Sequence, residues 1–158
     1  MESQPIKRSV QLQPLSREHH EGLLFAWKIR QGLKNGTDVS LMGRFVQWFW
    51  DTHLDHHFRQ EEQVLMSLLP GDALLARMQD EHQEIEALLH INQSIPDPAL
   101  LEQIAQQVND HIRFEERELF PHIEQSITEE QLNQVAAALA AEPKCTSSNW
   151  SEEFWTRK

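Results

Sequence analysis

Two fragments of the chain repeat one pair of residue types at one spacing. His57 precedes Glu61 by four positions, and His111 precedes Glu115 by four positions. On an α-helix, residues four apart lie one above the other on a single face, so each pair points an imidazole and a carboxylate in the same direction. Imidazole and carboxylate without thiolate suit iron, manganese or zinc. The spacing therefore predicts metal ligands on two separate helices.

Single histidines on two further segments have apolar neighbours at helical spacing. His20 is followed by apolar residues at offsets of three, four and seven, and His82 by apolar residues at offsets of three, six and seven. Both side chains are therefore expected on inward-facing stripes. His19, about 100° around the helix from His20, is the alternative on the first segment, and we prefer His20. Glu86 stands four residues after His82 and is a further candidate ligand, the alternative being a solvated edge residue.

Breaks in the sequence divide the chain into helices. Helical segments are expected at about 16–35, 38–69, 72–92, 97–127 and 128–141. Ser16 is predicted to cap the first segment, and Pro121 is predicted to end or kink the fourth. Caps for the other segments are supplied by Thr37 or Asp38, Asp72, Asp97 and the Thr128–Gln131 capping box.

Four long amphipathic helices with short connections define the expected architecture. They predict an all-α fold, an antiparallel up-down-up-down four-helix bundle with a short fifth C-terminal helix and a tail. We expect an extended lead-in at 1–14, the bundle at 15–127, and the short helix and tail at 128–158. The aromatic residues of the tail (Trp150, Phe154, Trp155) are expected to pack on the bundle or to form a homodimer contact.

Composition limits the classes of partner. The 158 residues carry a formal net charge of −11, so nucleic acid is not an expected partner, because little basic surface could neutralise phosphates. No apolar run is long enough to span a membrane, and the first ten residues lack the apolar stretch of a secretory signal. The single cysteine, Cys145, excludes an intramolecular disulfide. We therefore predict a cytoplasmic protein without a nucleic-acid or membrane partner.

Four histidines and two carboxylates inside a bundle need partners, because buried polar groups are costly when they are unpaired. A metal meets that need, and a carboxylate that spans two ions suits a dinuclear centre. Two six-coordinate ions require about 12 ligand positions. The four histidines, Glu61 and Glu115 as bridges, and an oxo or hydroxo bridge fill about ten of them. About two remain for solvent, a small molecule or Glu86, and open positions are typical of reactive sites.

The order of these residues resembles the hemerythrin-like (HHE cation-binding) family. The fragments LSREHH, HHFRQEE, DEHQEI and HIRFEERELFPHIE are each typical of it, and the resemblance covers about residues 15–125. It implies a four-helix bundle around a non-haem di-iron centre that binds or senses dioxygen, nitric oxide or cellular iron. It also implies nitrogen ligands from four histidines and bridging carboxylates from two glutamates, namely His20, His57, His82, His111, Glu61 and Glu115.

The sequence departs from the oxygen carriers of that family. Those carriers have a second histidine where this chain has Glu86, and an aspartate five residues after the fourth-helix histidine, where this chain has Glu115 at four. A carboxylate in place of an imidazole favours ferric iron, so we expect binding or sensing rather than reversible oxygen carriage. A di-iron enzyme for peroxide or nitric oxide turnover or iron-centre repair is the alternative. A mononuclear site, manganese or zinc loading, and an interaction bundle without metal are the remaining interpretations.

Overall fold

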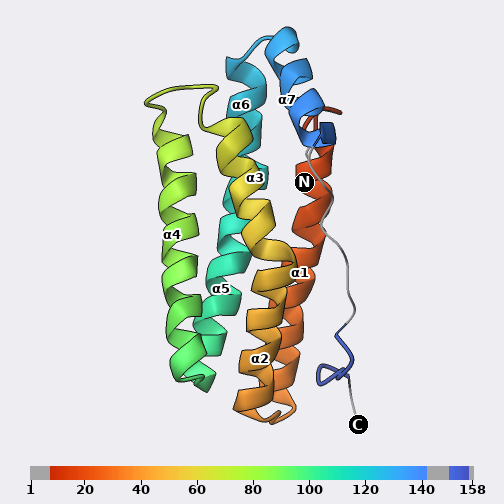
Figure 1. The fold of residues 1–158 in the computed structure, drawn as a ribbon, viewed down its shortest axis with the longest axis vertical. Helices are drawn as coiled ribbons and strands as arrows, with labels where there is room; N and C mark the ends of the chain where they lie inside the picture. The colour runs from red at the N-terminus through yellow and green to blue at the C-terminus, as the bar shows by residue number, and fades with distance from the viewer. Residues whose placement is uncertain (1–7, 142–149, 157–158) are drawn as a thin grey trace, which may run out of the picture.

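The computed structural model describes residues 8–141 and 150–156, and every regular element in these ranges is helical. The helices gather into a bundle (Figure 1), which confirms the all-α prediction. The elements in chain order are α1 (Gln13–Lys34), α2 (Val39–Phe49), the π-helix η1 (Trp50–Leu54), α3 (Asp55–Leu65), α4 (Ala73–Ser94), α5 (Pro98–Phe114), the π-helix η2 (Glu115–Leu119), α6 (Phe120–Ser126) and α7 (Glu129–Ala141).

Several of these elements join into longer helical rods, by which we mean stretches without an intervening loop. α2, η1 and α3 form one rod, α5, η2 and α6 form another, and α1 and α4 are rods by themselves. In Figure 1 the chain descends through α1, returns through the α2–α3 rod, descends again through α4 and rises through the α5–α6 rod. α7 packs at the end of the bundle where α1 begins.

Most of the predicted helix starts are present. The carboxylates of Asp38, Asp72 and Asp97 accept backbone hydrogen bonds at the starts of α2, α4 and α5. The capping box before α7 is formed in both directions, by Thr128 and Gln131.

The start of α1 differs from the prediction. The helix begins at Gln13, with Pro14 in its first turn, so Ser16 lies inside the helix and is not its cap. The last two residues of the expected extended lead-in, at 1–14, are therefore helical, and residues 1–7 lie outside the described ranges. Proline fits this position because its missing N–H belongs to a turn whose N–H groups have no helical partner.

The apolar core consists of two clusters with a buried polar layer between them. On α1, Leu15 belongs to one cluster and Phe25 to the other, and on α4 Met78 and Ile85 are divided in the same way. Buried histidines lie at the boundary on both helices, because residue 19 falls between 15 and 25, and residue 82 falls between 78 and 85. The fold therefore places polar side chains at one level across the bundle.

The described part of the tail packs against α1 and α2. Phe154 is buried, its ring centroid lies 5.0 Å from that of Phe45, and the Asn35 side chain donates hydrogen bonds to the carbonyls of Phe154 and Thr156. Cys145 lies outside the described residues. Within the described ranges, no helix combines the length and the apolar character that a membrane crossing requires.

Candidate metal centre

Six buried side chains converge in the polar layer from the four helical rods. α1 contributes His19, the α2–α3 rod His57 and Glu61, α4 His82, and the α5–α6 rod His111 and Glu115. All six are at most 3% exposed. Such groups are stable inside a protein only when they are paired or bind a metal.

The six side chains form two overlapping groups. His19 and His57 make one group with Glu61 and Glu115, and His82 and His111 make the other with the same two carboxylates. Within each group the candidate ligand atoms all lie within 4.8 Å of one another. Glu61 shows the sharing directly, because its Oε1 lies 3.3 Å from His57 Nε2 and 3.2 Å from His82 Nε2. Two carboxylates are thus common to two sets of imidazoles, and each of the two groups could hold a metal ion.

Each histidine also faces a second carboxylate on its outer side. The Nδ1 atoms of three imidazoles donate hydrogen bonds of 2.7–2.9 Å, since an ionised carboxylate only accepts. The pairs are His19 with Glu116, His57 with Glu18, and His111 with Glu81. A hydrogen bond at one ring nitrogen fixes the tautomer and leaves the other nitrogen free to bind a metal. These outer carboxylates therefore aim Nε2 of each ring toward the centre.

His82 is the exception in this outer ring of carboxylates. Its Nδ1 lies 3.6 Å from Glu62 Oε2, which is too long for a hydrogen bond. Both of its ring nitrogens are buried without a hydrogen-bond partner. Glu62 instead binds Arg59, at 3.1 Å.

The inner atoms of the cluster lack the hydrogen bonds expected of buried polar groups. Nε2 of His57, His82 and His111, both oxygens of Glu61 and Oε2 of Glu115 are buried without a hydrogen-bond partner. Native proteins contain few such atoms, and each calls for an explanation. All of them are imidazole nitrogens or carboxylate oxygens, which are atoms that bind metals, and they lie close together. The residues therefore fit a bound metal.

The electrostatics of the cluster favour charged side chains. Burial alone would lower the imidazole pKa values, but neighbouring carboxylates outweigh it. The charge of Glu61 and the hydrogen bond to Glu18 raise the pKa of His57 to about 9, and Glu115 and Glu81 raise that of His111 to about 10. Burial would likewise raise the pKa of Glu61, yet the adjacent imidazoles hold it well below its usual value. Metal binding must therefore displace protons from the imidazoles.

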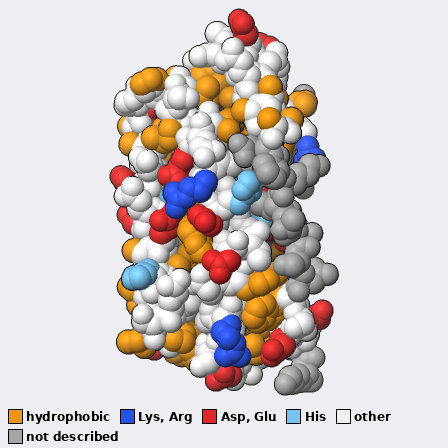
Figure 2. Space-filling model, in the orientation of Figure 1, with side chains coloured by type: hydrophobic (Ala, Val, Ile, Leu, Met, Phe, Trp, Pro, Cys, Tyr) orange, Lys and Arg blue, Asp and Glu red, His pale blue; other side chains and the backbone are white. Residues whose placement is uncertain are grey.

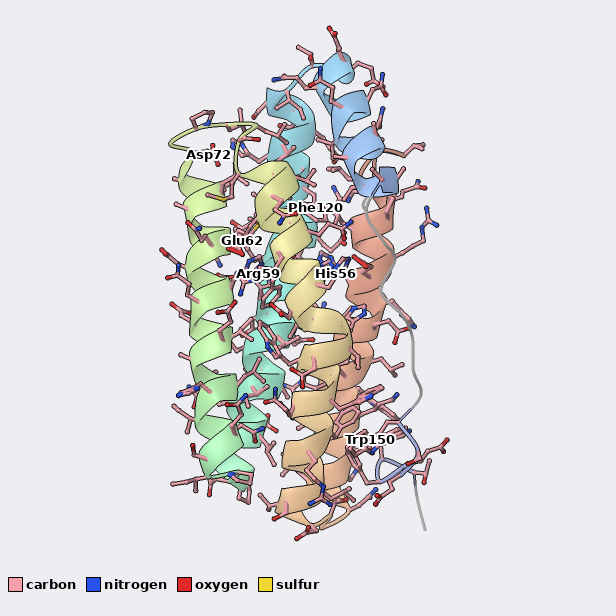
Figure 3. The ribbon with its side chains drawn as sticks, in the orientation of Figure 1. His56, Arg59, Glu62, Asp72, Phe120 and Trp150 are labelled. Atoms are coloured by element: carbon pink, nitrogen blue, oxygen red, sulfur yellow. The ribbon has the colours of Figure 1, made fainter. Side chains whose placement is uncertain are left out.

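Aromatic rings enclose the polar layer. Phe58 stacks on His82 with ring centroids 3.9 Å apart, and Phe120, labelled in Figure 3, stacks on His19 at 5.4 Å. Both phenylalanines are buried. They restrict rotation of the imidazoles and keep water from the site, which strengthens the electrostatic interactions inside it.

The histidine contributed by α1 is His19, which corrects the prediction of His20. His20 is exposed and belongs to neither group. The apolar residues that favoured His20 are not the buried stripe, since Trp27 is 48% exposed. The stripe instead includes Gly22, where an added Cβ would lie 2.5 Å from Ile112 Cδ1. A small residue at this position lets α1 approach α5 closely, and a glycine next to His19 on the buried face adds no hydrophobic signal.

Glu86 is the second correction. Its carboxylate pairs with Arg59 rather than pointing to the cluster, and it belongs to neither group. The other five predicted side chains, His57, Glu61, His82, His111 and Glu115, are brought together with His19.

The sequence analysis did not identify the outer carboxylates. Glu18, Glu62, Glu81 and Glu116 each face a histidine on another helix. No spacing within one helix marks such a contact. Only Glu62 and Glu116 could have been suspected from the sequence, because they directly follow the predicted ligands Glu61 and Glu115.

A helical bundle that buries two overlapping histidine–carboxylate groups belongs to the class of proteins that could hold metal ions in their core. The family model described as the hemerythrin HHE cation binding domain matches residues 12–123. The chain therefore belongs to the hemerythrin HHE cation-binding domain family, as its motifs indicated. The matched range includes all six clustered side chains. Neither a curated protein nor a solved structure matched the chain.

Proposed function

We propose that this chain is a cytoplasmic di-iron protein that binds or senses dioxygen, nitric oxide or the cellular iron and redox state. In this proposal the four rods act as an antiparallel four-helix bundle around two oxo- or hydroxo-bridged iron ions. The observation that carries it is the pair of buried groups that share Glu61 and Glu115. A single ion would need only one of these groups. A purely structural core would not retain so many buried nitrogen and oxygen atoms without hydrogen-bond partners.

The ligand count supports a centre with open positions. Four imidazoles and two bridging carboxylates supply about eight of the roughly 12 positions of two six-coordinate ions. A bridging oxygen supplies about two more, and because Glu86 is bound elsewhere, about two are left for solvent or a small molecule. When bound, an iron pair supplies redox-active ions with positions at which dioxygen or nitric oxide can coordinate.

The surrounding residues favour sensing over reversible oxygen carriage. The outer carboxylates of Glu18, Glu81 and Glu116 accept Nδ1–H hydrogen bonds and make the imidazoles more basic. Added negative charge stabilises the higher oxidation state of a bound metal, whereas reversible oxygen carriage requires a stable ferrous form. Phe58 and Phe120 limit access of water.

Elemental analysis of anaerobically purified protein, combined with its absorption spectrum, tests the proposal. We expect about two iron ions per chain, one for each group of ligands, and near-ultraviolet bands after oxidation. Azide and nitric oxide should change the spectrum by occupying the open positions. Zinc at one ion per chain, or a spectrum that none of these molecules changes, would contradict the proposal.

A matched pair of variants links the result to the geometry. Glu61→Gln removes a shared carboxylate, and Glu86→Gln makes the same change four residues from His82 but outside the cluster. We expect Glu61→Gln to reduce the iron content, since an amide is a weaker bridging ligand, and Glu86→Gln to leave two ions bound. Equal iron contents in the two variants would remove the support for a shared carboxylate.

A further inference from the structure

Arg59 lies on the outside of α3, over the polar layer, and binds three carboxylates. Its guanidinium is 3.2 Å from Asp55 Oδ1 and 3.1 Å from Glu62 Oε2, and it also pairs with Glu86 of α4. Figure 3 labels Arg59 and Glu62 between α3 and α4, and Figure 2 shows a basic side chain with acidic neighbours on this face. We call these four residues the Arg59 cluster. The cluster carries two more negative than positive charges, so it attracts cations.

The Arg59 cluster differs from the other arginine–carboxylate contacts at the site. Glu81 binds Arg77 at 2.8 Å while it also accepts a hydrogen bond from His111 at 2.7 Å. Glu116 is likewise held on both sides, by Arg8 at 3.0 Å and by His19 at 2.7 Å. Glu62 differs, since Arg59 binds it at 3.1 Å whereas His82 Nδ1 lies 3.6 Å away, beyond hydrogen-bond distance.

A buried, unpartnered nitrogen faces this cluster from inside. The side chain of His82 is 1% exposed, its Nδ1 has no hydrogen-bond partner, and Glu62 is the carboxylate that it faces. The opposite nitrogen of the same ring lies 3.2 Å from the shared Glu61. Polar atoms thus continue from the surface carboxylates, through the two nitrogens of His82, to the shared Glu61, and the bonds of Arg59 lie at the outer end.

We propose that the Arg59 cluster is the entry port through which divalent cations reach the metal centre. This inference rests on the proposed function. Arg59 swings into solvent, and the carboxylates of Glu62, Glu86 and Asp55 receive the hydrated cation. The cation then passes to His82 and Glu61, after which Arg59 binds the three carboxylates again and closes the port. Arg59 is 48% exposed, so it can leave without opening the apolar core.

Metal-loading kinetics of the metal-free full chain test the port, with cobalt(II) chloride as the probe and its absorption as the signal. Arg59→Gln removes the closing side chain. Arg77→Gln is the matched control, because it makes the same charge change at an arginine that is also 48% exposed but whose Glu81 stays bound to His111. We expect loading about tenfold faster in Arg59→Gln, since the three ion pairs of Arg59 no longer have to break, and within about twofold of the unsubstituted chain in Arg77→Gln.

A double variant tests the role of Glu62. In Arg59→Gln/Glu62→Gln the port is open but the receiving carboxylate is gone, so the acceleration should disappear. An equal acceleration in Arg59→Gln and Arg77→Gln would show that net charge alone matters. That result would overturn the port. An unchanged rate in Arg59→Gln would also overturn it, and so would an acceleration that persists in the double variant.

Equilibrium binding separates the two proposals. Cobalt(II) should reach about two ions per chain in the unsubstituted protein and in all these variants, since none of the substituted residues belongs to the two ligand groups. If the unsubstituted chain takes up fewer than two ions, the dinuclear function fails. If it takes up two but the loading rates do not separate as described, only the port fails.

Discussion

The adjacent histidines of α1 offer a sharp test of the site, because the structure gives them opposite environments. His19 is buried, with Nε2 2.8 Å from Glu115 and Nδ1 2.7 Å from Glu116. His20 is exposed. His19→Ala and His20→Ala remove the same atoms one residue apart, in one case from the metal centre and in the other from the surface.

The size of the expected effect follows from the ligand groups. His19 supplies one of the two imidazoles in its group. Loss of an outer hydrogen-bond partner of a ligand weakens metal binding by about 10–100-fold, so loss of the ligand itself should cost at least about 100-fold. At a free metal concentration about 100 times Kd, one ion stabilises the folded chain by about 2.7 kcal/mol. Most of that gain should vanish in His19→Ala, which corresponds to about 5–10 °C in Tm for a chain of this size.

Thermal unfolding of each variant, with and without metal, measures this loss. The difference between the two conditions cancels structural effects of the substitution that are common to both. We expect His19→Ala to retain about one ion per chain and to lose much of the metal-dependent rise in Tm. His20→Ala should keep both ions and stay within about 0.5 kcal/mol of the unsubstituted chain. If His20→Ala lost an ion and the metal-dependent rise in Tm while His19→Ala kept both, His19 would be refuted as a ligand.

Three other predictions concern the outer carboxylates, the protons and the packing. Glu81→Ala should weaken metal binding by about 10–100-fold in a chelator competition, because it removes the partner of His111 Nδ1. Apparent metal affinity should rise with pH through the raised pKa values of His57, about 9, and His111, about 10, and a flat profile would contradict this. Conversely, these imidazoles stabilise the metal-free chain fully below their unfolded pKa of about 6.5, and this stabilisation is lost as the pH rises through the folded values. Gly22→Ala should lower the free energy of unfolding in urea by about 1–3 kcal/mol, since its Cβ would meet Ile112; an unchanged midpoint would exclude the close contact.

The features that the sequence predicted well are those determined within one helix. Asp72 and Asp97 were identified as caps because capping depends on a side chain and the next three residues. His57 and Glu61 were paired because residues four apart share a face in any α-helix. Such features need no knowledge of the neighbouring helices.

The features that were missed depend on contacts between helices. His20 was preferred over His19 because hydrophobicity was used as the measure of burial, whereas α1 buries Gly22 and Gly32 against other segments. Glu81 reaches His111 from another helix, at a separation of 30 residues. Glu86 was taken as a ligand from its place after His82, but Arg59 of the neighbouring helix binds it. Tertiary packing determined each of these outcomes.

The two π-helices explain how apolar side chains return to the core on either side of the polar layer. Buried Phe49 and His57 are eight residues apart across η1, and buried Glu115 and Ile123 are eight apart across η2. On a regular α-helix, eight residues rotate a side chain about 80° out of phase, whereas seven rotate it by only about 20°. A π-helical turn absorbs one residue, so each segment restores nearly the seven-residue phase.

η2 also ends just before Pro121, whose ring would clash with the carbonyl four residues earlier in a regular helix. Both rods that supply a histidine and a glutamate contain such a turn, while α1 and α4, which supply one histidine each, are regular throughout their described lengths. The π-helices therefore allow one rod to bury two polar ligands and still return apolar side chains to the core on either side.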